Sequence, residues 1–362
     1  MERMKSIYSA LGRWLEQGEP IALATIIETR GSTPQIAGAS AVFSKEGLLF
    51  GTLGGGTVEL DAQERAVRCL AERRSLHYQF ELQGLDLGAE EAICGGSVSI
   101  LIDAAPLNHL ETFQFLKASL LSRQTGVLIS KFSPAFSNDV SISRRWLGEK
   151  AVLQGLQEKD LSFVAAEILE SLREGTPQLV RSKESGAGES LLFLEPLYPL
   201  PKLVIAGAGH IGRAVAHLGG LLGFEVTVID DRAEFADSKR FPEADTVIVK
   251  DIGRAVADFA ITSDTYVVIV TRGHSHDAEA LRACIKSSAA YIGVIGSRRK
   301  VSLTREKFIS EGWATAAQFD RVRAPIGLEI GSTTVDEIAV SIAAELVLVR
   351  SSAGRPKRGG QK

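Results

Sequence analysis

The sequence predicts an α/β protein with a C-terminal Rossmann-type parallel sheet and a separate N-terminal α+β domain. Beyond residue 200, five short segments are rich in β-branched residues and almost continuously apolar, and intervals of helix length separate them. Strands that are buried on both faces have this composition, and their alternation with helices is typical of a parallel sheet. The segments are residues 203–207, 225–230, 245–250, 265–271 and 291–296.

Length, charge and cysteine content exclude several classes of protein. The chain has 362 residues, enough for two domains, and its formal net charge of −3 gives no reason to expect nucleic acid or an anionic membrane as a partner. Its three cysteines form no Cys-x-x-Cys pair, so neither a zinc site nor a disulfide framework is indicated, and we expect a cytoplasmic protein. No run of about 18 apolar residues is present, so we expect no membrane-spanning helix.

The N-terminal part predicts a mixture of helices and strands that includes one hairpin. Two apolar runs flank Lys45-Glu46-Gly47, as the strands of a hairpin flank its turn. Helices are predicted at residues 7–16, 57–72 and 163–173, and strands at residues 21–28, 39–44, 48–53, 97–103, 126–130 and 191–194.

A proline-rich segment divides the chain. Residues 195–203 read EPLYPLPKL, which predicts a stiff linker. We therefore assign residues 1–195 to the N-terminal domain, in which 106–195 are hard to interpret. Residues 196–350 form the Rossmann-type domain, and 351–362 form a basic flexible tail.

Residues 207–212 read Gly-Ala-Gly-His-Ile-Gly, the spacing of a dinucleotide-binding turn. A predicted strand precedes the turn, and a helix that begins at His210 follows it. Gly207 permits the tight turn, Gly209 lets the backbone approach a pyrophosphate, and Gly212 lets the helix pack against the strand. The pyrophosphate would lie at the helix N-terminus. The turn therefore predicts nucleotide binding, with a glycine turn that binds nothing as the alternative.

An acidic residue ends the next predicted strand. Asp230 lies 18 residues after Gly212, where a carboxylate accepts hydrogen bonds from ribose hydroxyls. This carboxylate argues against a phosphate on the 2′ position of the ribose, although Arg232 leaves that ligand open.

Two polar loops are expected at the same edge of the sheet, because ligands bind at the carboxyl ends of the strands. Residues 271–277 read Thr-Arg-Gly-His-Ser-His-Asp, and we assign Thr271 and His274 to the cofactor-binding set. A metal site that uses two histidines is one alternative, and a helix cap formed by Ser275 or Asp277 is another.

The second loop, residues 296–300, reads Gly-Ser-Arg-Arg-Lys and places three cations at the start of a helix. A bound anion would offset their repulsion with the helix dipole. Ser297 and Arg298 therefore join the candidate cofactor-binding residues. A solvated surface cluster is the alternative.

A run of glycines leads from a strand into a helix in the N-terminal half. Gly54, Gly55, Gly56 and Thr57 precede a helical segment that carries Glu59. Glycines before a helix expose several backbone N–H groups, which make a cradle for an oxyanion or a phosphate. The alternative is a hairpin-to-helix turn with Thr57 as its N-cap.

Two more turns belong to the same region. Residues 30–34 form a turn in which Arg30 and Ser32 present donors, and Cys94 opens a Cys-Gly-Gly turn before a strand. A reactive thiol needs accessible, electropositive surroundings. Cys94 is thus a candidate reactive thiol, with a small buried side chain as the alternative.

Together these motifs resemble the XdhC/CoxI family, the accessory factors of molybdenum hydroxylases such as xanthine dehydrogenase. The most specific motif ends in a helix start where Thr334 and Glu337 have the spacing of a capping box. Residues 106–195 show no resemblance. The matching stretches are ETRGSTPQIAGA (28–39), GTLGGGTVE (51–59), CGG (94–96), GAGHIG (207–212), VIDDRAEFAD with FPEAD (228–245), GVIGSRRK (293–300) and APIGLEIGSTTVDEIAVSIAAEL (324–346).

The resemblance implies a chaperone rather than an enzyme. Family members bind the molybdenum cofactor, assist the replacement of a terminal oxo ligand by sulfur together with a cysteine desulfurase, and deliver the cofactor to an apo hydroxylase of the xanthine dehydrogenase type. The phosphate of molybdopterin, or the pyrophosphate of its dinucleotide form, suits the glycine turns. Asp231, in the VIDDRAEFAD stretch, joins the cofactor-binding set. We also consider a homodimer.

The sequence departs from the family pattern at one position. The family commonly has a cysteine in the GGC-V-E motif, where this chain has Thr57, and this excludes a thiolate role there. Cys94 is the remaining motif cysteine, and with Glu59 it makes up the candidate catalytic set. No metal ligand is predicted.

Two other functions stay open. An NAD(P)-dependent oxidoreductase would use the glycine turn and Asp230, with His274 and His276 as its only candidate proton donors. A nucleotide-sensing regulatory protein would use the Rossmann unit as a ligand switch.

Overall fold

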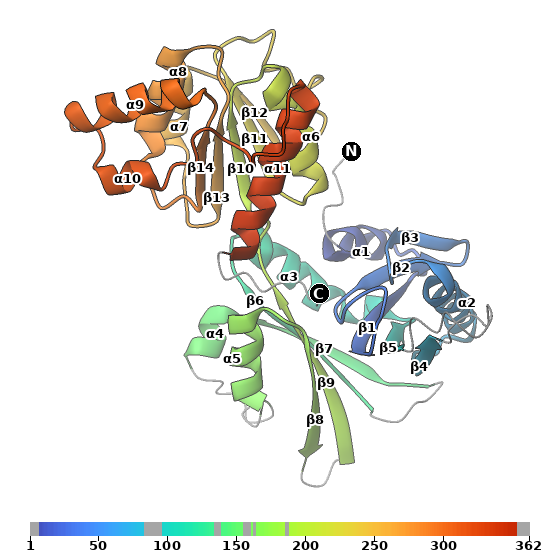
Figure 1. Cartoon of the computed structure of the whole chain (residues 1–362). Coiled ribbons are helices and arrows are strands. Elements are labelled where there is room, and N and C mark those ends of the chain that lie inside the picture. The colour runs from blue at the N-terminus through green and yellow to red at the C-terminus, as the bar shows by residue number, and fades with distance from the viewer. Residues whose placement is uncertain are drawn as a thin grey trace, which may run out of the picture. The chain divides into compact units, whose positions relative to one another are not determined.

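The computed structural model describes residues 7–82, 96–133, 139–154, 161, 164–184 and 188–352 (Figure 1). These residues form two compact units, of which the first ends at Pro199 and the second begins at Leu200. No described helix is long and apolar enough to cross a membrane.

The first unit begins with an antiparallel sheet of five strands. Its strands are β1 (Ala22–Arg30), β2 (Ser40–Ser44), β3 (Gly47–Gly51), β4 (Leu76–Leu82) and β5 (Gly96–Asp103), and its helices are α1 (Ile7–Glu16), α2 (Gly56–Glu72) and α3 (Leu110–Leu121). The strand order is β3-β2-β1-β5-β4, and the predicted hairpin between β2 and β3 is confirmed. Side chains alternate between the faces of β1: Ala24 packs with α2, and Leu23 packs with α1 and α3.

A second antiparallel sheet follows, where the sequence predicted only two short strands and a helix. The elements are η1 (Pro106–His109), β6 (Gly126–Phe132), β7 (Ile142–Gly148), α4 (Glu149–Leu153), α5 (Ala165–Glu174), β8 (Gln178–Glu184) and β9 (Gly188–Leu197). The strand order is β7-β6-β9-β8. Because β9 continues to Leu197, the first residues of the predicted linker belong to a strand. Pro196 is tolerated there because β8 ends its pairing at Leu194, which leaves Pro196 paired only with Val127 of β6.

A buried ion pair connects the two sheets of the first unit. Nε of Arg144, on β7, lies 3.2 Å from a carboxylate oxygen of Asp103, on β5, and the two side chains are 3% and 2% exposed. Arg144 also donates a hydrogen bond of 2.7 Å to Ser130 on β6. Buried charges require such partners, so this pair fixes how the sheets meet.

The second unit contains the predicted parallel sheet. Its strands are β10 (Lys202–Ala206), β11 (Glu225–Asp230), β12 (Thr246–Val249), β13 (Thr265–Ile269) and β14 (Tyr291–Val294). Its helices are α6 (His210–Leu221), α7 (Ile252–Asp258), α8 (His274–Cys284), α9 (Arg298–Ser310), α10 (Ala316–Asp320) and α11 (Val335–Ser352). The order β12-β11-β10-β13-β14 places the first strand at the centre, as in a Rossmann half, and all pairs are parallel.

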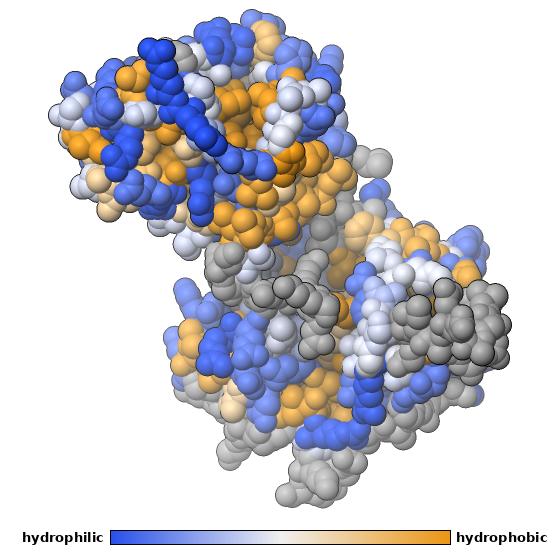
Figure 2. Space-filling model, viewed as in Figure 1, coloured by the Kyte–Doolittle hydropathy of each residue, from blue (hydrophilic) through white to orange (hydrophobic). Residues whose placement is uncertain are grey.

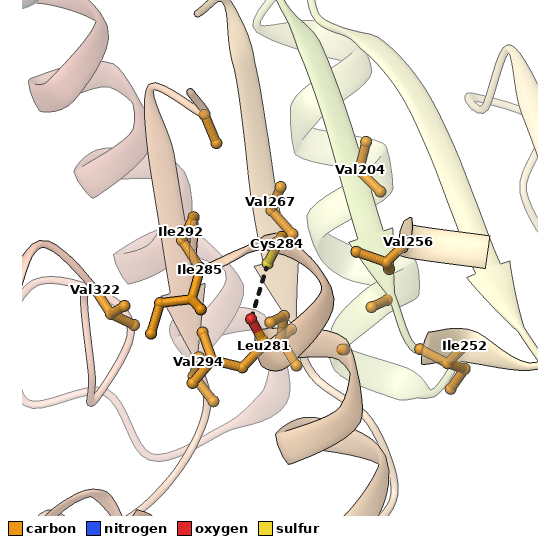
Figure 3. Close-up of a cluster of buried hydrophobic side chains, with 14 of the residues drawn as sticks. Val204, Ile252, Val256, Val267, Leu281, Cys284, Ile285, Ile292, Val294 and Val322 are labelled. Carbon is orange, nitrogen blue, oxygen red and sulfur yellow. Dashed lines mark hydrogen bonds between the residues drawn. The ribbon is translucent and has the colours of Figure 1, made fainter. Parts of the chain in front are cut away.

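Each face of this sheet has its own core. Val204 and Val267 face α7 and α8 (Figure 3), whereas Leu203 and Ile205 face α6 and α11. This alternation follows from the pleat of a strand, and it buries the whole strand.

One side of α11 is apolar and exposed. Val340, Val347 and Leu348 are 49%, 37% and 52% exposed, and Figure 2 shows hydrophobic residues gathered over this helix. Their spacing of seven and eight residues puts them on one helical face, opposite the face that packs on α6.

Candidate functional site

The dinucleotide turn joins β10 to α6. Gly207 has a φ of +118°, which favours glycine, and a Cβ added to Gly212 would lie 1.9 Å from the Gly207 carbonyl oxygen. The first turn of α6 therefore lies directly against the glycine turn. A Cβ added to Gly209 would meet nothing within 4 Å, and His210 beside it is exposed. The backbone is open where a pyrophosphate would approach the helix N-terminus.

Asp230, at the end of β11, already has four hydrogen bonds. Its Oδ2 accepts from the backbone N–H of Ala208 at 2.8 Å and from Nη2 of Arg232 at 3.0 Å. Its Oδ1 accepts from the backbone N–H and from Nε of Arg232, at 3.1 and 2.9 Å. A carboxylate has about four acceptor positions, so none is left for a ribose hydroxyl.

The same contacts keep Asp230 ionised. The residue is 1% exposed, and this burial alone would raise the pKa of its carboxyl group. The hydrogen bonds from Arg232 and Ala208 outweigh burial and lower that pKa to about 2. In this structure the carboxylate supports the turn and holds Arg232 in place.

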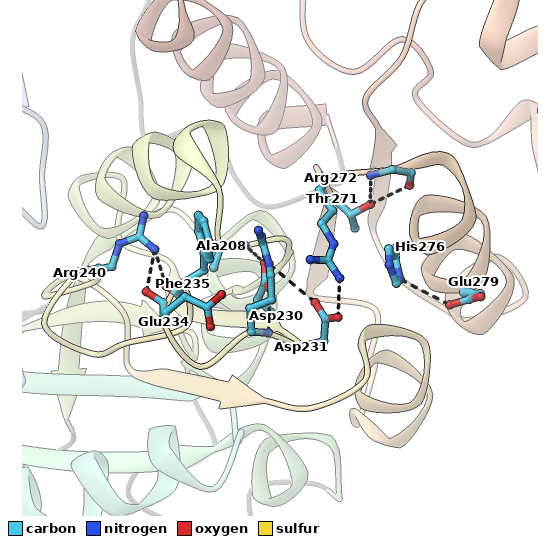
Figure 4. Close-up of polar contacts among 12 residues, drawn as sticks. Ala208, Asp230, Asp231, Glu234, Phe235, Arg240, Thr271, Arg272, His276 and Glu279 are labelled. Carbon is cyan, nitrogen blue, oxygen red and sulfur yellow. Dashed lines mark hydrogen bonds and ion pairs between the residues drawn. The ribbon is translucent and has the colours of Figure 1, made fainter.

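Arginines from two loops line the region beside Asp230 (Figure 4). Nη2 of Arg272, in the loop after β13, donates to Asp231, in the loop after β11, at 2.9 Å. This pair spans the carboxyl end of β10, which lies between those two strands. The guanidinium of Arg232 lies 3.7 Å from the ring centroid of Phe235. The surface next to the turn is therefore rich in guanidinium donors.

Asp277 connects the two polar loops rather than capping a helix. Its Oδ1 accepts from the hydroxyl and the backbone N–H of Thr271, at 2.6 and 3.2 Å, and its Oδ2 accepts from Nζ of Lys300 at 2.7 Å. The residue that caps α8 is Gly273, so the predicted cap by Ser275 or Asp277 is wrong. The Asp277 carboxylate therefore joins the two loops as the buried partner of Lys300.

His276 is the histidine of this loop whose side chain the structure describes. His276 faces Glu279, its Nδ1 3.8 Å from the carboxylate. The side chain of His274 lies outside the described part of the structure, although its backbone begins α8. Among the described residues, no three His, Cys, Asp or Glu side chains are grouped so that they could hold a metal ion.

Ser297, a predicted cofactor-binding residue, is the N-cap of α9. The hydroxyl of Ser297 accepts a hydrogen bond from the backbone N–H of Lys300 at 3.3 Å. Arg298 pairs with Glu329 across the surface, and the two side chains are 81% and 83% exposed. Arg298 is therefore accessible to a ligand but already has an anionic partner.

The glycine run of the first unit has an unusual backbone. Gly54, Gly55 and Gly56 have φ values of +109°, +71° and +58°, which side chains other than glycine rarely adopt. A Cβ added to Gly55 or Gly56 would meet nothing within 4 Å, so the turn is open on that side. The N-cap of α2 is Gly55 with no side-chain cap, so the alternative of Thr57 as N-cap is wrong. Thr57 is exposed in the first turn of the helix.

Glu59 holds this turn from inside the helix. Its Oε2 accepts from the hydroxyl of Thr52 at 2.6 Å and from the backbone N–H of Leu53 at 2.9 Å. Burial would raise the pKa of the Glu59 carboxyl, but the hydrogen bonds from Thr52, Leu53 and the Gly55 N–H outweigh it, so that the pKa is lowered. The carboxylate is ionised and shapes the glycine run.

The turn at residues 30–34 lies between two of the glycine motifs. A Cβ on Gly54 would lie 2.9 Å from the Pro34 side chain, and a Cβ on Gly96 would lie 2.3 Å from the Ser32 carbonyl oxygen. Arg30 extends into solvent with 66% of its side chain exposed and lies 3.4 Å from Glu28. The structure thus brings together the two predicted cofactor-binding segments of this unit.

The described cysteines are not reactive thiols. Cys69 and Cys284 are buried, and burial raises the pKa of their thiols to about 11 and about 12. Cys94, the predicted catalytic thiol, lies outside the described residues.

Residues 14–80 match the family described as XdhC and CoxI, and residues 203–346 match the XdhC Rossmann domain. The chain belongs to the XdhC and CoxI family. The resemblance inferred from the motifs is thereby confirmed. The matched ranges contain the glycine run of the first unit and the dinucleotide turn of the second, whereas Cys94 lies between them.

Relatives of this XdhC-family chain extend over nearly its whole length. A Bacillus subtilis protein, named as a probable xanthine dehydrogenase subunit, is 26% identical over 96% of this chain and 98% of its own. The molybdenum cofactor insertion chaperone PaoD of Escherichia coli is 23% identical over 93% of this chain and 85% of its own. The uncharacterized protein YqeB of Escherichia coli is 26% identical, but the chain spans only 47% of its length.

A solved structure shares the fold. A crystal structure described as a xanthine dehydrogenase from Bacillus halodurans aligns with a TM-score of 0.72 at 24% identity, covering 95% of this chain and 96% of the other.

Two residues beside Asp230 and Asp231, Arg272 and Phe235, were not predicted from the sequence as members of the site. A signal for Arg272 was present, since it follows a strand that ends at the same sheet edge as Asp231. For Phe235 no local pattern distinguished a ring that supports an arginine from one in the core.

Proposed function

We propose that this chain binds the molybdenum cofactor, assists its sulfuration, and delivers it to an apo hydroxylase of the xanthine dehydrogenase type. The observation that carries this proposal is the similarity, over both units, to a protein named as a molybdenum cofactor insertion chaperone. The match of both units to XdhC families supports the same role.

The glycine run of the first unit is our candidate for holding the cofactor phosphate. Three consecutive glycines with positive φ form the start of a helix of 17 residues, whose first residue is Gly56, and the space over Gly55 and Gly56 is open. N–H groups at such a helix start suit a phosphate. Arg30 and Ser32 would add donors from the adjacent turn, and Glu59 would keep the run in shape. When bound, the cofactor supplies the molybdenum centre that the hydroxylase uses.

Sulfuration needs a thiol that the described cysteines do not supply, because both are buried with raised pKa values. Thr57 cannot carry sulfur. We therefore propose that the sulfur donor is the partner cysteine desulfurase, with Cys94 as the candidate receiving thiol in this chain.

A charge reversal at Thr57 tests the phosphate site. Thr57→Glu adds a negative charge in the first turn of α2, which the helix dipole tolerates or favours, but the charge repels a phosphate bound at the same N-terminus. Thr57→Gln is the matched control, with nearly the same shape and no charge. We expect the glutamate variant to lose at least tenfold in affinity for molybdopterin in anaerobic equilibrium dialysis, and the glutamine variant to bind like the parent.

The outcome decides between functions. Equal affinity in the two variants would remove the cofactor phosphate from this turn. A parent chain that binds no molybdopterin, but binds NADH and turns over hydride, would replace the chaperone function by an NAD(P)-dependent oxidoreductase.

The partners follow from the proposed role. They are the apo hydroxylase and the cysteine desulfurase, with the cytoplasm as the compartment. The exposed apolar face of α11 also fits a homodimer, because such patches mark interaction surfaces. Sedimentation of the purified chain, alone and with Val347→Lys, measures whether this face associates.

A further inference from the structure

We propose that the Rossmann unit binds a 2′-phosphorylated adenine dinucleotide, NADP(H), in preference to NAD(H). The proposal concerns the second unit only and goes beyond the cofactor role proposed above. It rests on which hydrogen-bonding groups are still available at the end of β11.

The carboxylate at the usual position for reading a ribose diol is already occupied. Rossmann proteins that bind NAD read the 2′-hydroxyl with a carboxylate at the end of the second strand. Here that carboxylate, Asp230, accepts four hydrogen bonds from Ala208 and Arg232 and is 1% exposed. The next residue, Asp231, is paired with Arg272 at 2.9 Å. A ribose hydroxyl would have to displace Arg232 or Ala208 before it could donate to Asp230, the carboxylate that ends the second strand.

Donors, in contrast, remain available. Arg232 uses Nε and Nη2 on Asp230, and its Nη1 makes no hydrogen bond to any residue that the structure describes. The side chain is 20% exposed, so a ligand can reach it. A guanidinium only donates, and its best partner is a phosphate or carboxylate oxygen. An arginine near the ribose is also what accommodates a 2′-phosphate in Rossmann proteins.

The arginine is held ready for such a ligand. Two hydrogen bonds to Asp230 fix its fork, and the guanidinium lies 3.7 Å from the Phe235 ring centroid. Arg240 covers the same ring at 4.9 Å and donates to the Glu234 and Phe235 carbonyl groups. A preorganised side chain loses little entropy on binding.

Charge does not oppose the phosphate. The two carboxylates that would repel it, Asp230 and Asp231, are each paired with an arginine at 2.9 Å. A 2′-phosphate that binds the Arg232 guanidinium would therefore meet acids whose charge is already balanced by arginines.

Titration of the full chain with NADPH and NADH, followed by nucleotide fluorescence, tests the proposal directly. We expect NADPH to bind at least tenfold more tightly, and adenosine 2′,5′-bisphosphate to compete better than 5′-AMP. Equal binding, tighter NADH binding, or no binding of either dinucleotide would overturn the proposal. This comparison needs no variant and does not depend on how any substitution folds.

Replacement of the arginine provides the second test. Arg232→Ala should lower NADPH affinity at least tenfold and leave NADH affinity equal or higher, since Asp230 regains free acceptor positions. The control is Arg305→Ala. Arg305, on α9, forms an exposed ion pair with Asp320, on α10, at 2.9 Å, and its replacement should leave both affinities unchanged. A preference for NADPH that survives in the folded Arg232→Ala variant would refute the role of this residue.

Discussion

Asp230→Asn should destabilise the second unit by an amount that the structure allows us to work out. The contacts of Asp230 lower the pKa of its carboxyl group from 3.8 to about 2. One pKa unit corresponds to about 1.4 kcal/mol, so these contacts favour the ionised form over the neutral form by about 2.5 kcal/mol. Asparagine resembles the neutral acid in shape and charge. We therefore expect a loss of about 2–3 kcal/mol in the free energy of unfolding at pH 7.

The pH dependence has a defined sign. Because the folded pKa is depressed, the stabilisation is fully present above the unfolded pKa of about 4 and disappears as the pH falls through about 2. The difference between the parent and the variant should thus shrink to about half near pH 3.

The free energy of unfolding of the second unit is measured at pH 7 by pulsed hydrogen exchange across a urea series, with mass spectrometry of peptides from β10 and β11. At pH 3, circular dichroism follows unfolding across the same urea series. The control is Asp251→Asn, the N-cap of α7, which accepts from Arg254 N–H at 2.9 Å. Asparagine caps as well as aspartate, so little change is expected. If Asp230→Asn costs no more than this control, the carboxylate does not support the turn as we describe.

Two more substitutions have clear expectations. Gly212→Ala places a methyl group 1.9 Å from the Gly207 carbonyl oxygen, so the melting temperature and nucleotide binding should both fall. The control is Gly209→Ala, whose methyl group would meet nothing within 4 Å and should leave the melting temperature unchanged. Equal melting temperatures of the two variants would contradict the packing argument. Lys300→Met leaves a buried carboxylate without its cation and should cost about 3 kcal/mol in urea unfolding. Arg298→Met breaks only an exposed pair and should cost less than about 1 kcal/mol, so equal losses would refute this difference.

The second unit could be predicted from the sequence because its signals are local. Each of its strands is an apolar run that turn residues interrupt, and the predicted strand 225–230 has the observed bounds of β11. Strands buried on both faces need no knowledge of distant partners to be recognised. The capping box at the last helix is confirmed for the same reason, since Thr334 and Glu337 exchange hydrogen bonds three residues apart.

The second sheet of the first unit could not be predicted because its burial depends on distant residues. β7 contains Arg144, which is typical of an exposed strand, yet the side chain is 3% exposed. It is buried only because Asp103 meets it from another sheet, 41 residues earlier. The end of β9 could not be predicted for a similar reason. A proline is tolerated at position 196 of this strand because β8 stops pairing with β9 at Leu194.

The sequence indicated where Asp230 lies but not what it contacts. Asp230 follows the glycine turn at the spacing of an acidic residue that binds the ribose of a dinucleotide. Its carboxylate instead accepts hydrogen bonds from the side chain of Arg232, only two residues away. The spacing of the motif does not reveal that this side chain folds back onto Asp230.

The residues that cover α6 lie on α11 and are synthesised late. The apolar side of this helix, with Val215 and Ala216, packs against Ala339, Ile342 and Leu346 of α11. A ribosome releases the dinucleotide turn early and these covering residues only after the rest of the unit. Until then part of the apolar face of α6 lacks its cover, and apolar surface that is exposed during folding is prone to aggregation.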